Sequence, residues 1–303
     1  MLKSAIPKQT SQEFLRKFDE SIDWMRSLGV NVDQGRLTNY RTAAQQWVSM
    51  LDENREDRQR GIEHLPAITS AVYEVPQFLE IHAAFRGERI AHLGGIGAKL
   101  KKAIEGPVHL QSETEKSNGP RNFLFEAVTA ARVHRPNNGS FTILNAPTDT
   151  GFILHKSSIW VECKRLTSEA QLKANVNKAC RQLKRTIDKH PKINQRGLVA
   201  LDVSKLITMP PPQYVFESPT ESEIGPRSEA IIDQYIRDNS HVWEHEYTDQ
   251  DSRIIGTLLR LSLIAVSKDV GKYVFVHQWG INPRRGIDID DQKLLREATK
   301  CFR

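Results

Sequence analysis

An acid and a base, Glu162 and Lys164, lie two positions apart in the otherwise mostly apolar segment 159–165 (IWVECKR). Successive side chains of a β-strand point to opposite faces of the sheet. In a strand, Glu162 and Lys164 would share one face with Trp160, and the apolar residues between them would face a core. The spacing therefore predicts a carboxylate and an ammonium group side by side on one surface.

A second acid, Asp149, begins the strand that is predicted directly before this one. A tight turn at residues 156–157 would pair the two strands with Asp149 opposite Lys164 and Gly151 opposite Glu162. The small glycine would leave room for an ion beside the acid. A shift of the pairing by one residue would turn Asp149 to the other face of the sheet. The predicted cluster of Asp149, Glu162 and Lys164 therefore depends on the register.

This set of groups suits metal-dependent hydrolysis of a phosphodiester. Mg²⁺ and Mn²⁺ prefer oxygen ligands and keep several of their waters, so Asp149 and Glu162 are the expected ligands, with the backbone carbonyl of Cys163 as a third. The ion would lower the pKa of a bound water. Lys164 would either orient that water or stabilise the transition state, and the residue types do not decide between these two roles.

A further acid, Glu126, is the single acidic residue of a predicted helix at 122–134, where it falls on an otherwise apolar stripe. A lone buried carboxylate is costly, so such an acid is either paired or part of a site. Glu126 is therefore a candidate for the same active site. The alternative is a structural salt bridge, for which Arg165 and Lys164 are the candidate partners.

The rest of the chain supplies the elements that would position these residues. The first third is predicted to be helical, at 14–28, 37–52, 67–85 and 98–104, with a break at Pro76. Residues 111–120 (QSETEKSNGP) contain no aliphatic or aromatic side chain and are typical of a linker. Beyond it, helices are predicted at 122–134, 168–189 and 229–237, and strands at 141–144, 149–154, 159–165, 197–203, 258–266 and 272–279.

This order predicts an α/β fold with one sheet, preceded by an all-helical N-terminal region. The expected domains are a helical region for recognition or assembly at 1–110, the linker at 111–120, and a catalytic domain at 121–303.

Together, the helix with Glu126, the strand with Asp149, the strand with Glu162 and Lys164, a second helix and an apolar strand resemble the PD-(D/E)xK nuclease superfamily. The resemblance covers roughly residues 122–204. It implies a restriction-endonuclease-like core, in which a mixed central sheet is flanked by helices.

The resemblance also implies roles for single residues. Asp149 and Glu162 would bind the metal, Lys164 would be the catalytic lysine, and Glu126 would be the helix acid of many members. Gln182 would be the helix glutamine that some branches place near the site. One departure is the proline that often directly precedes the aspartate in the family. Here Thr148 separates the two residues.

The helix at 168–189 is rich in basic residues. They can contact phosphates or form a solvated face, and both interpretations stay open. With Arg165 at the end of the preceding strand, the candidate nucleic-acid-binding residues are Lys173, Lys178, Arg181, Lys184 and Arg185.

Three other motifs favour structural interpretations. Residues 94–99 (GGIGAK) resemble the hairpin of a helix-hairpin-helix DNA-binding module, but a simple helix start is favoured. The acid and the histidines of segment 241–246 are interpreted as a surface loop rather than a metal site. His277 and Trp279 share one strand face, where packing or contact with the substrate edge is expected rather than catalysis.

Composition constrains the partners only weakly. The 303 residues carry a net charge of +6, from 43 basic and 37 acidic residues, which fits a polyanionic partner without requiring one. Three cysteines without metal-site spacing indicate a reducing compartment. The N-terminus lacks the apolar core of a secretory signal, and no apolar run is long enough for a membrane span. A cytoplasmic location is therefore expected.

The sequence thus predicts a nuclease that uses Mg²⁺ or Mn²⁺, with DNA favoured over RNA as its substrate. One alternative is a catalytically silent nuclease-like module that binds nucleic acid or protein. Another is that the helical region defines the function as an assembly module, with the nuclease core as its effector and a protein partner bound through the helices. The oligomeric state stays open, and a homodimer is compatible with the sequence.

Overall fold

The computed structural model describes residues 11–52, 58–134, 140–143, 146, 148–189, 194–208, 215–248, 251–269 and 272–302. The described residues form two compact units, one ending at Val128 and the other beginning at Thr129. The division falls inside helix α5 (Gly119–Val133) and not in the predicted linker at 111–120. None of the helices in these ranges combines the length and apolar character needed to span a bilayer.

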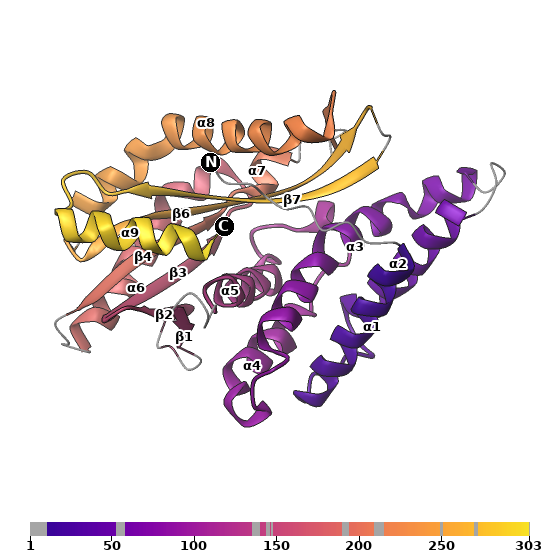
Figure 1. Cartoon of the computed structure of the whole chain (residues 1–303), viewed down its shortest axis with the longest axis horizontal. Coiled ribbons are helices and arrows are strands. Elements are labelled where there is room, and N and C mark those ends of the chain that lie inside the picture. The colour runs from indigo at the N-terminus through magenta and orange to yellow at the C-terminus, as the bar shows by residue number, and fades with distance from the viewer. Residues whose placement is uncertain are drawn as a thin grey trace. The chain divides into compact units, whose positions relative to one another are not determined.

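The N-terminal unit is helical, as predicted (Figure 1). Its main helices are α1 (Ser11–Ser27), α2 (Arg36–Asp52), α3 (Arg58–Phe85), α4 (Gly94–Ala103) and the first part of α5.

Two expectations about these helices need correction. Helix α3 is not broken at Pro76, since it continues through both Pro66 and Pro76. A proline removes one backbone hydrogen bond, but Val75, Phe78 and other side chains around Pro76 are almost fully buried, and such packing supplies most of a helix's stability. Helix α4 also starts earlier than predicted, because the glycine-rich segment forms its first turn.

The C-terminal unit contains a seven-stranded mixed sheet with flanking helices, which confirms the α/β class (Figure 1). Strands β2 and β3 form an antiparallel hairpin with β1 on its outer edge, and β4 lies parallel to β3. Strand β6 is parallel to β4 and β5 and antiparallel to β7. The strands are β1 (Ser140–Thr142), β2 (Thr150–Leu154), β3 (Ser157–Arg165), β4 (Gln195–Asp202), β5 (Val215–Ser218), β6 (Ile254–Ser267) and β7 (Lys272–Pro283).

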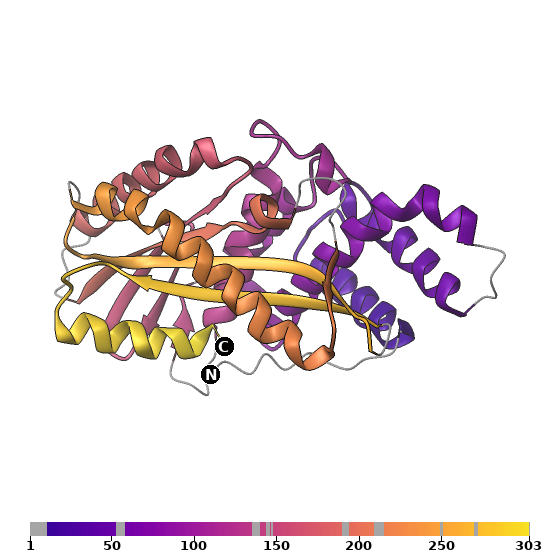
Figure 2. The same ribbon diagram turned by 90° about the horizontal axis from the view of Figure 1, so that it is seen from above.

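Helices α6 (Leu172–Lys189) and α8 (Glu221–Thr248) cover one face of this sheet, which we call the α6 face. Their side chains, including Val176 and Trp243, share a hydrophobic cluster with Trp160 of β3 and Val199 of β4. Figure 2 shows α8 crossing the long strands β6 and β7 on this side. Glu162 and Lys164 follow Trp160 at intervals of two residues, so their side chains point to the same face of β3 as the Trp160 side chain. They therefore also belong to the α6 face.

The opposite face carries the C-terminal helix α9 (Ile289–Cys301) and the end of α5. Phe302, directly after α9, packs edge-on against Phe152 of β2, and the Cys163 thiol contacts the Thr129 hydroxyl at 3.8 Å. Strand β5, the short helix α7 (Ser204–Thr208) and α9 were not predicted from the sequence.

Helix α8 corrects a further expectation. It is much longer than the predicted helix at 229–237 and contains His241, His245 and Glu246, which were expected in a surface loop. Glu246 is buried and accepts a hydrogen bond from the Asn177 side chain at 2.5 Å. The hydrogen bond between Asn177 and Glu246 therefore links α6 to α8.

Candidate active site

The register of the β2–β3 hairpin positions the candidate acids. Leu154 pairs with Ser157 and Thr150 pairs with Val161, so the turn consists of residues 155–156. This register differs by two residues from the predicted one. A shift by an even number keeps every side chain on its face. Asp149, directly before Thr150, therefore stays on the α6 face, opposite Glu162 rather than Lys164.

The same shift changes what lies beside the glycine of β2. Gly151 pairs with Trp160 and not with Glu162, so the space predicted for an ion is filled by the indole ring. A Cβ atom on Gly151 would lie 2.8 Å from Cε3 of Trp160. The Trp160 ring is further fixed by a hydrogen bond from its Nε1 to the Gln195 side chain at 3.0 Å. Gly151 thus makes room for the aromatic side chain of Trp160.

The three residues predicted to converge, Asp149, Glu162 and Lys164, do lie together. The ammonium nitrogen of Lys164 is 3.1 Å from Oδ2 of Asp149 and 3.1 Å from Oε2 of Glu162. The two carboxylate oxygens can therefore be no further apart than twice that distance. They are close enough for one cation to contact both carboxylates.

The backbone of Cys163 adds a third oxygen at this place. Its N–H donates to Oδ2 of Asp149 at 2.8 Å, where β2 has ended and no longer pairs with β3. In a strand, the N–H and C=O groups of one residue point to the same side. The Cys163 carbonyl therefore faces the edge of β3 at which Asp149 lies, as a third metal ligand would require.

Burial and charge govern the protonation of the cluster. Burial, the charge of Asp149 and a hydrogen bond with Asp149 raise the pKa of Glu162 to about 8, against the opposing effect of Lys164. Burial alone would lower the pKa of Lys164, but the charges of Asp149 and Glu162 outweigh it and raise that pKa. Without a bound cation, Glu162 therefore holds a proton at neutral pH while Lys164 stays charged.

These donors fit a hard divalent cation. Two carboxylates and one carbonyl would leave the remaining positions of an octahedral Mg²⁺ to water and substrate. The described residues contain no group of three or more His, Cys, Asp or Glu side chains that could hold a metal. In this part of the chain, acidic, thiol and imidazole side chains therefore do not surround an ion by themselves, without water.

Glu126 belongs to the other unit and has partners of its own. One of its carboxylate oxygens accepts a hydrogen bond from the ammonium group of Lys99, and the other accepts one from the Asn122 amide at 2.9 Å. Lys99 of α4 is thus a charged partner of Glu126 that the sequence did not indicate. The pattern of apolar positions identified a buried acid but not its partner.

Helix α6 places the remaining candidates. Gln182 is partly buried, and its Oε1 atom has no hydrogen-bond partner among the described residues. The helix exposes the predicted basic side chains to solvent, and one of them, Lys173, lies 3.8 Å from Glu246. The exposed set is Lys173, Lys178, Arg181, Lys184 and Arg185.

Arg165 does not fit its predicted role in binding nucleic acid. It is only 5% exposed, and its guanidinium group forms an ion pair with Asp202 of β4 at 2.6 Å. Arg260 of β6 lies 3.6 Å from the same carboxylate. Arg165 directly follows Lys164 in β3, so its side chain points to the face of the sheet opposite the candidate site. No pattern in the sequence indicated this buried ion-pair cluster, because its members are far apart along the chain.

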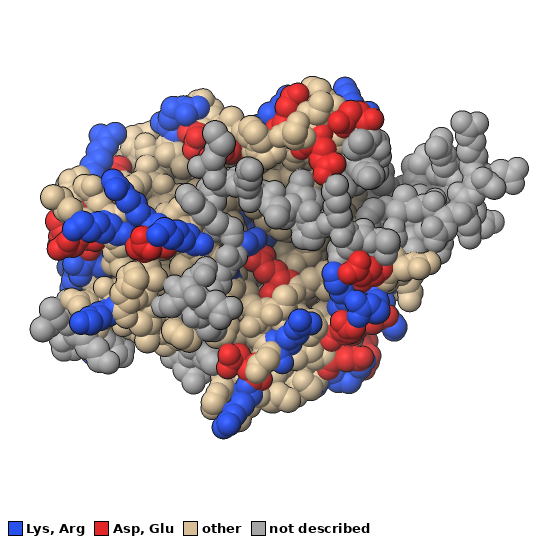
Figure 3. Space-filling model, viewed as in Figure 1, with Lys and Arg blue, Asp and Glu red and all other residues tan. Residues whose placement is uncertain are grey.

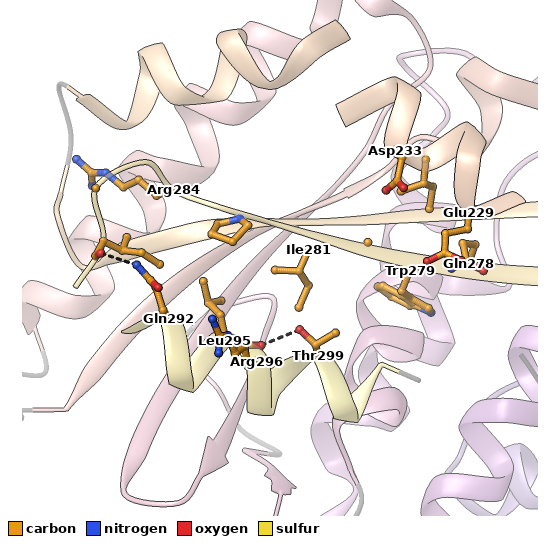
Figure 4. A pocket seen from close by; sticks show the side chains of 15 residues that line it. Glu229, Asp233, Gln278, Trp279, Ile281, Arg284, Gln292, Leu295, Arg296 and Thr299 are labelled. Atoms are coloured by element: carbon orange, nitrogen blue, oxygen red, sulfur yellow. Dashed lines mark hydrogen bonds between the residues drawn. The ribbon is translucent and has the colours of Figure 1, made fainter. Parts of the chain in front are cut away.

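A separate pocket of about 390 Å³ lies beside β7, between α8 and α9 (Figure 4). Its walls carry charges of both signs, with Glu229 and Asp233 on α8 and Arg284 and Arg296 further along the groove. None of its lining residues belongs to the cluster of Asp149, Glu162 and Lys164. On the face shown in Figure 3, Lys and Arg side chains are interspersed with Asp and Glu.

Comparison of the chain with protein-family models, curated proteins and solved structures gives no significant match.

Proposed function

We propose that this chain is a Mg²⁺-dependent nuclease that hydrolyses phosphodiester bonds, with DNA as the favoured substrate. The observation that carries the proposal is the contact of one ammonium group, Lys164, with two carboxylates, Asp149 and Glu162, at 3.1 Å each. These groups combine the oxygen ligands of a hard cation with a positive charge where a phosphate would lie.

The topology supports the same proposal. Helix α5, strands β1 to β3, helix α6 and strand β4 follow one another along the chain, with β2 antiparallel and β4 parallel to β3. We infer that these elements form a restriction-endonuclease-like core. Because one fold can host several functions, the proposal depends on the site rather than on the topology.

Each residue has a defined part in the proposed mechanism. Asp149 and Glu162 would hold Mg²⁺ together with the Cys163 carbonyl, and the ion would supply an activated water and neutralise charge on the phosphate. Glu162 would give up its proton on binding the cation, since metal ligands must be deprotonated. Lys164 would keep its charge beside the phosphate and stabilise the negative charge that builds up during the reaction.

The exposed basic side chains of α6 would contact the phosphate backbone of the substrate. Glu126 and Gln182 remain proposed assisting residues, and the cytoplasmic location remains a prediction. One observation favours the alternative of a silent, nuclease-like binding module. The described residues contain no third carboxylate, thiol or imidazole side chain grouped with the two acids.

A cleavage assay separates these two functions. The purified chain is incubated with supercoiled, linear and single-stranded DNA and with RNA, in Mg²⁺, Mn²⁺, Ca²⁺ or EDTA. We expect cleavage in Mg²⁺ or Mn²⁺ only, and a loss of about 100-fold or more for Lys164→Met and Asp149→Asn.

Lys300→Met is the matched control, because Lys300 is an exposed lysine of α9 that pairs with Glu297 outside the site. Equal cleavage by the wild type and by the two site variants would show a contaminant or a wrong site. A chain that binds DNA but cleaves no substrate, and takes up no Mg²⁺, would establish the silent module instead.

A further inference from the structure

Two large apolar side chains, Phe141 and Ile153, are exposed side by side on the α6 face of the β1–β2 hairpin. Phe141 is 48% exposed and Ile153 is 43% exposed. They are direct partners in the register of the two strands, so their side chains lie next to each other on one face. Apart from this pair, Ile90 and Ile289 are the other exposed large hydrophobic residues in the part of the chain that the structure describes.

This apolar pair lies on the same sheet face as the candidate active site. Asp149, Gly151 and Ile153 alternate along one line, and Trp160 lies over Gly151 between the acid and the apolar pair. Ile153 is four residues from Asp149, which corresponds to about 14 Å along a strand. A few nucleotides of a single strand cover this distance, at about 3.4 Å each when stacked.

The helices that the structure describes do not bury the apolar pair. Helix α6 packs on β3 and β4, and α9 contacts β2 from the opposite face through the Phe152 side. The exposure of Phe141 and Ile153 shows that their α6-face side chains stay accessible. The side chain of Asp149 is also partly exposed. Gly151 and Trp160, which lie between Asp149 and the apolar pair, are buried. Ile143 and Ala146 pack against the hydrophobic cluster that contains Trp160, so a bound strand would pass over these side chains.

The size of the apolar pair identifies its occupant. Two half-exposed side chains offer on the order of 200 Å², whereas a stable protein interface needs about 1,000 Å² or more. A second copy of this chain or a partner protein would therefore find too little apolar area here. A single nucleobase matches the area of one aromatic ring, and bases stack on exposed aromatic side chains whatever their sequence.

We propose that Phe141 and Ile153 form a stacking platform for an unpaired nucleobase, so that the substrate of the site is single-stranded or locally unpaired nucleic acid. This inference rests on the proposed nuclease function and adds the substrate class to it. Bases inside a duplex are already stacked on their neighbours and do not offer a free face to the ring.

Binding can be measured without cleavage, in EDTA, by fluorescence anisotropy with the full chain. The probes are a labelled oligothymidylate, the same strand with abasic sites in place of its bases, and a duplex of equal length. We expect the wild type to bind the oligothymidylate more tightly than the abasic strand. Phe141→Ala should weaken binding to the base-bearing strand about 5- to 100-fold and leave binding to the abasic strand unchanged.

Two further variants and one control complete the test. Phe141→Trp keeps an aromatic ring and should restore binding, and Phe141→Leu removes the ring while keeping an apolar side chain. Ile289→Ala truncates an exposed residue of α9 that is 69% exposed outside the hairpin, and should bind like the wild type.

The proposal is overturned if Phe141→Ala weakens binding to the base-bearing and abasic strands equally, or if it leaves binding to both unchanged. It is also overturned if the wild type binds the two strands equally well. Association of the wild type into dimers that Phe141→Ala abolishes would assign the pair to a second copy of the chain. Base-dependent binding without cleavage would contradict the nuclease alone. Cleavage without base-dependent binding would contradict the platform alone.

Discussion

The Asp149 carboxylate accepts a hydrogen bond from the backbone N–H of Cys163 at 2.8 Å. Asp149 precedes β2, yet its side chain continues the hydrogen bonding of the hairpin at the point where β2 no longer pairs with β3. The acid is therefore held by the backbone that lies between Glu162 and Lys164. One strand thus fixes the positions of all three polar groups of the candidate site.

This hydrogen bond predicts different effects of two substitutions at Asp149. Asp149→Ala removes the acceptor of the Cys163 N–H, and we expect the free energy of unfolding to fall by about 1–3 kcal/mol. Asp149→Asn keeps an acceptor oxygen, so its free energy of unfolding should fall by less. Both variants should lose cleavage. Urea unfolding measures the difference. Equal stability of the two variants would mean that the hydrogen bond contributes nothing.

The protonation of Glu162 predicts that Mg²⁺ binding depends on pH. Burial and the charge of Asp149 raise the pKa of Glu162 to about 8, while Lys164 opposes the rise. Because the ligand must be deprotonated, the apparent affinity should increase up to about tenfold per pH unit between pH 6 and 8, and level off above that. Calorimetry in buffers of different ionisation enthalpy should detect release of about one proton at pH 7. No proton release, or affinity that is constant over this range, would contradict the assignment.

The contact between Gly151 and Trp160 predicts that a methyl group is not tolerated there. In Gly151→Ala the new Cβ atom would lie 2.8 Å from the Trp160 ring, and we expect a loss of about 1–3 kcal/mol in the free energy of unfolding. Gly225→Ala is the matched control, because a Cβ atom in that helix has no neighbour within 4 Å. It should be neutral or stabilising by up to about 1 kcal/mol. Similar losses at both positions would contradict the close packing.

The buried ion pair between Asp202 and Arg165 predicts a strong effect on stability. Removing the charge in Asp202→Asn leaves Arg165 and Arg260 buried beside a neutral group, and should cost about 3–5 kcal/mol. Asp290→Asn, the same change at an exposed side chain paired with Lys293, should stay within about 0.5 kcal/mol. Thermal unfolding of the two variants compares them directly.

The same pair predicts an acid-sensitive contribution to stability. Burial would raise the pKa of Asp202, but Arg165 and Arg260 outweigh it and lower that pKa below its unfolded value. The stabilisation is therefore fully present above the unfolded pKa, and is lost as the pH falls through the lower, folded pKa. In Asp202→Asn, the free energy of unfolding should vary less with pH in this acidic range. If the free energy of unfolding depended on acidic pH in the same way in both proteins, this role of Asp202 would be contradicted.

The sequence by itself determined which residues share a strand face. Alternation is a local property of the extended chain, so the α6-face position of Asp149, Glu162 and Lys164 followed from their spacing and from the parity of the pairing. The register itself did not follow, because the turn at 155–156 contains neither glycine nor asparagine, and His155 adopts a positive φ of 53° that its residue type does not predict. Gly151 consequently faces Trp160 instead of an ion.

Only the tertiary structure decided the partners of the buried charges. Glu126 pairs with Lys99, and Arg165 pairs with Asp202. A buried charge left unpaired is costly, and in both pairs the opposite charge comes from an element far away in the sequence. Local spacing therefore identified the candidate acids and the lysine, whereas the packing of whole helices and strands assigned Arg165 to the core and left Phe141 and Ile153 exposed beside the site.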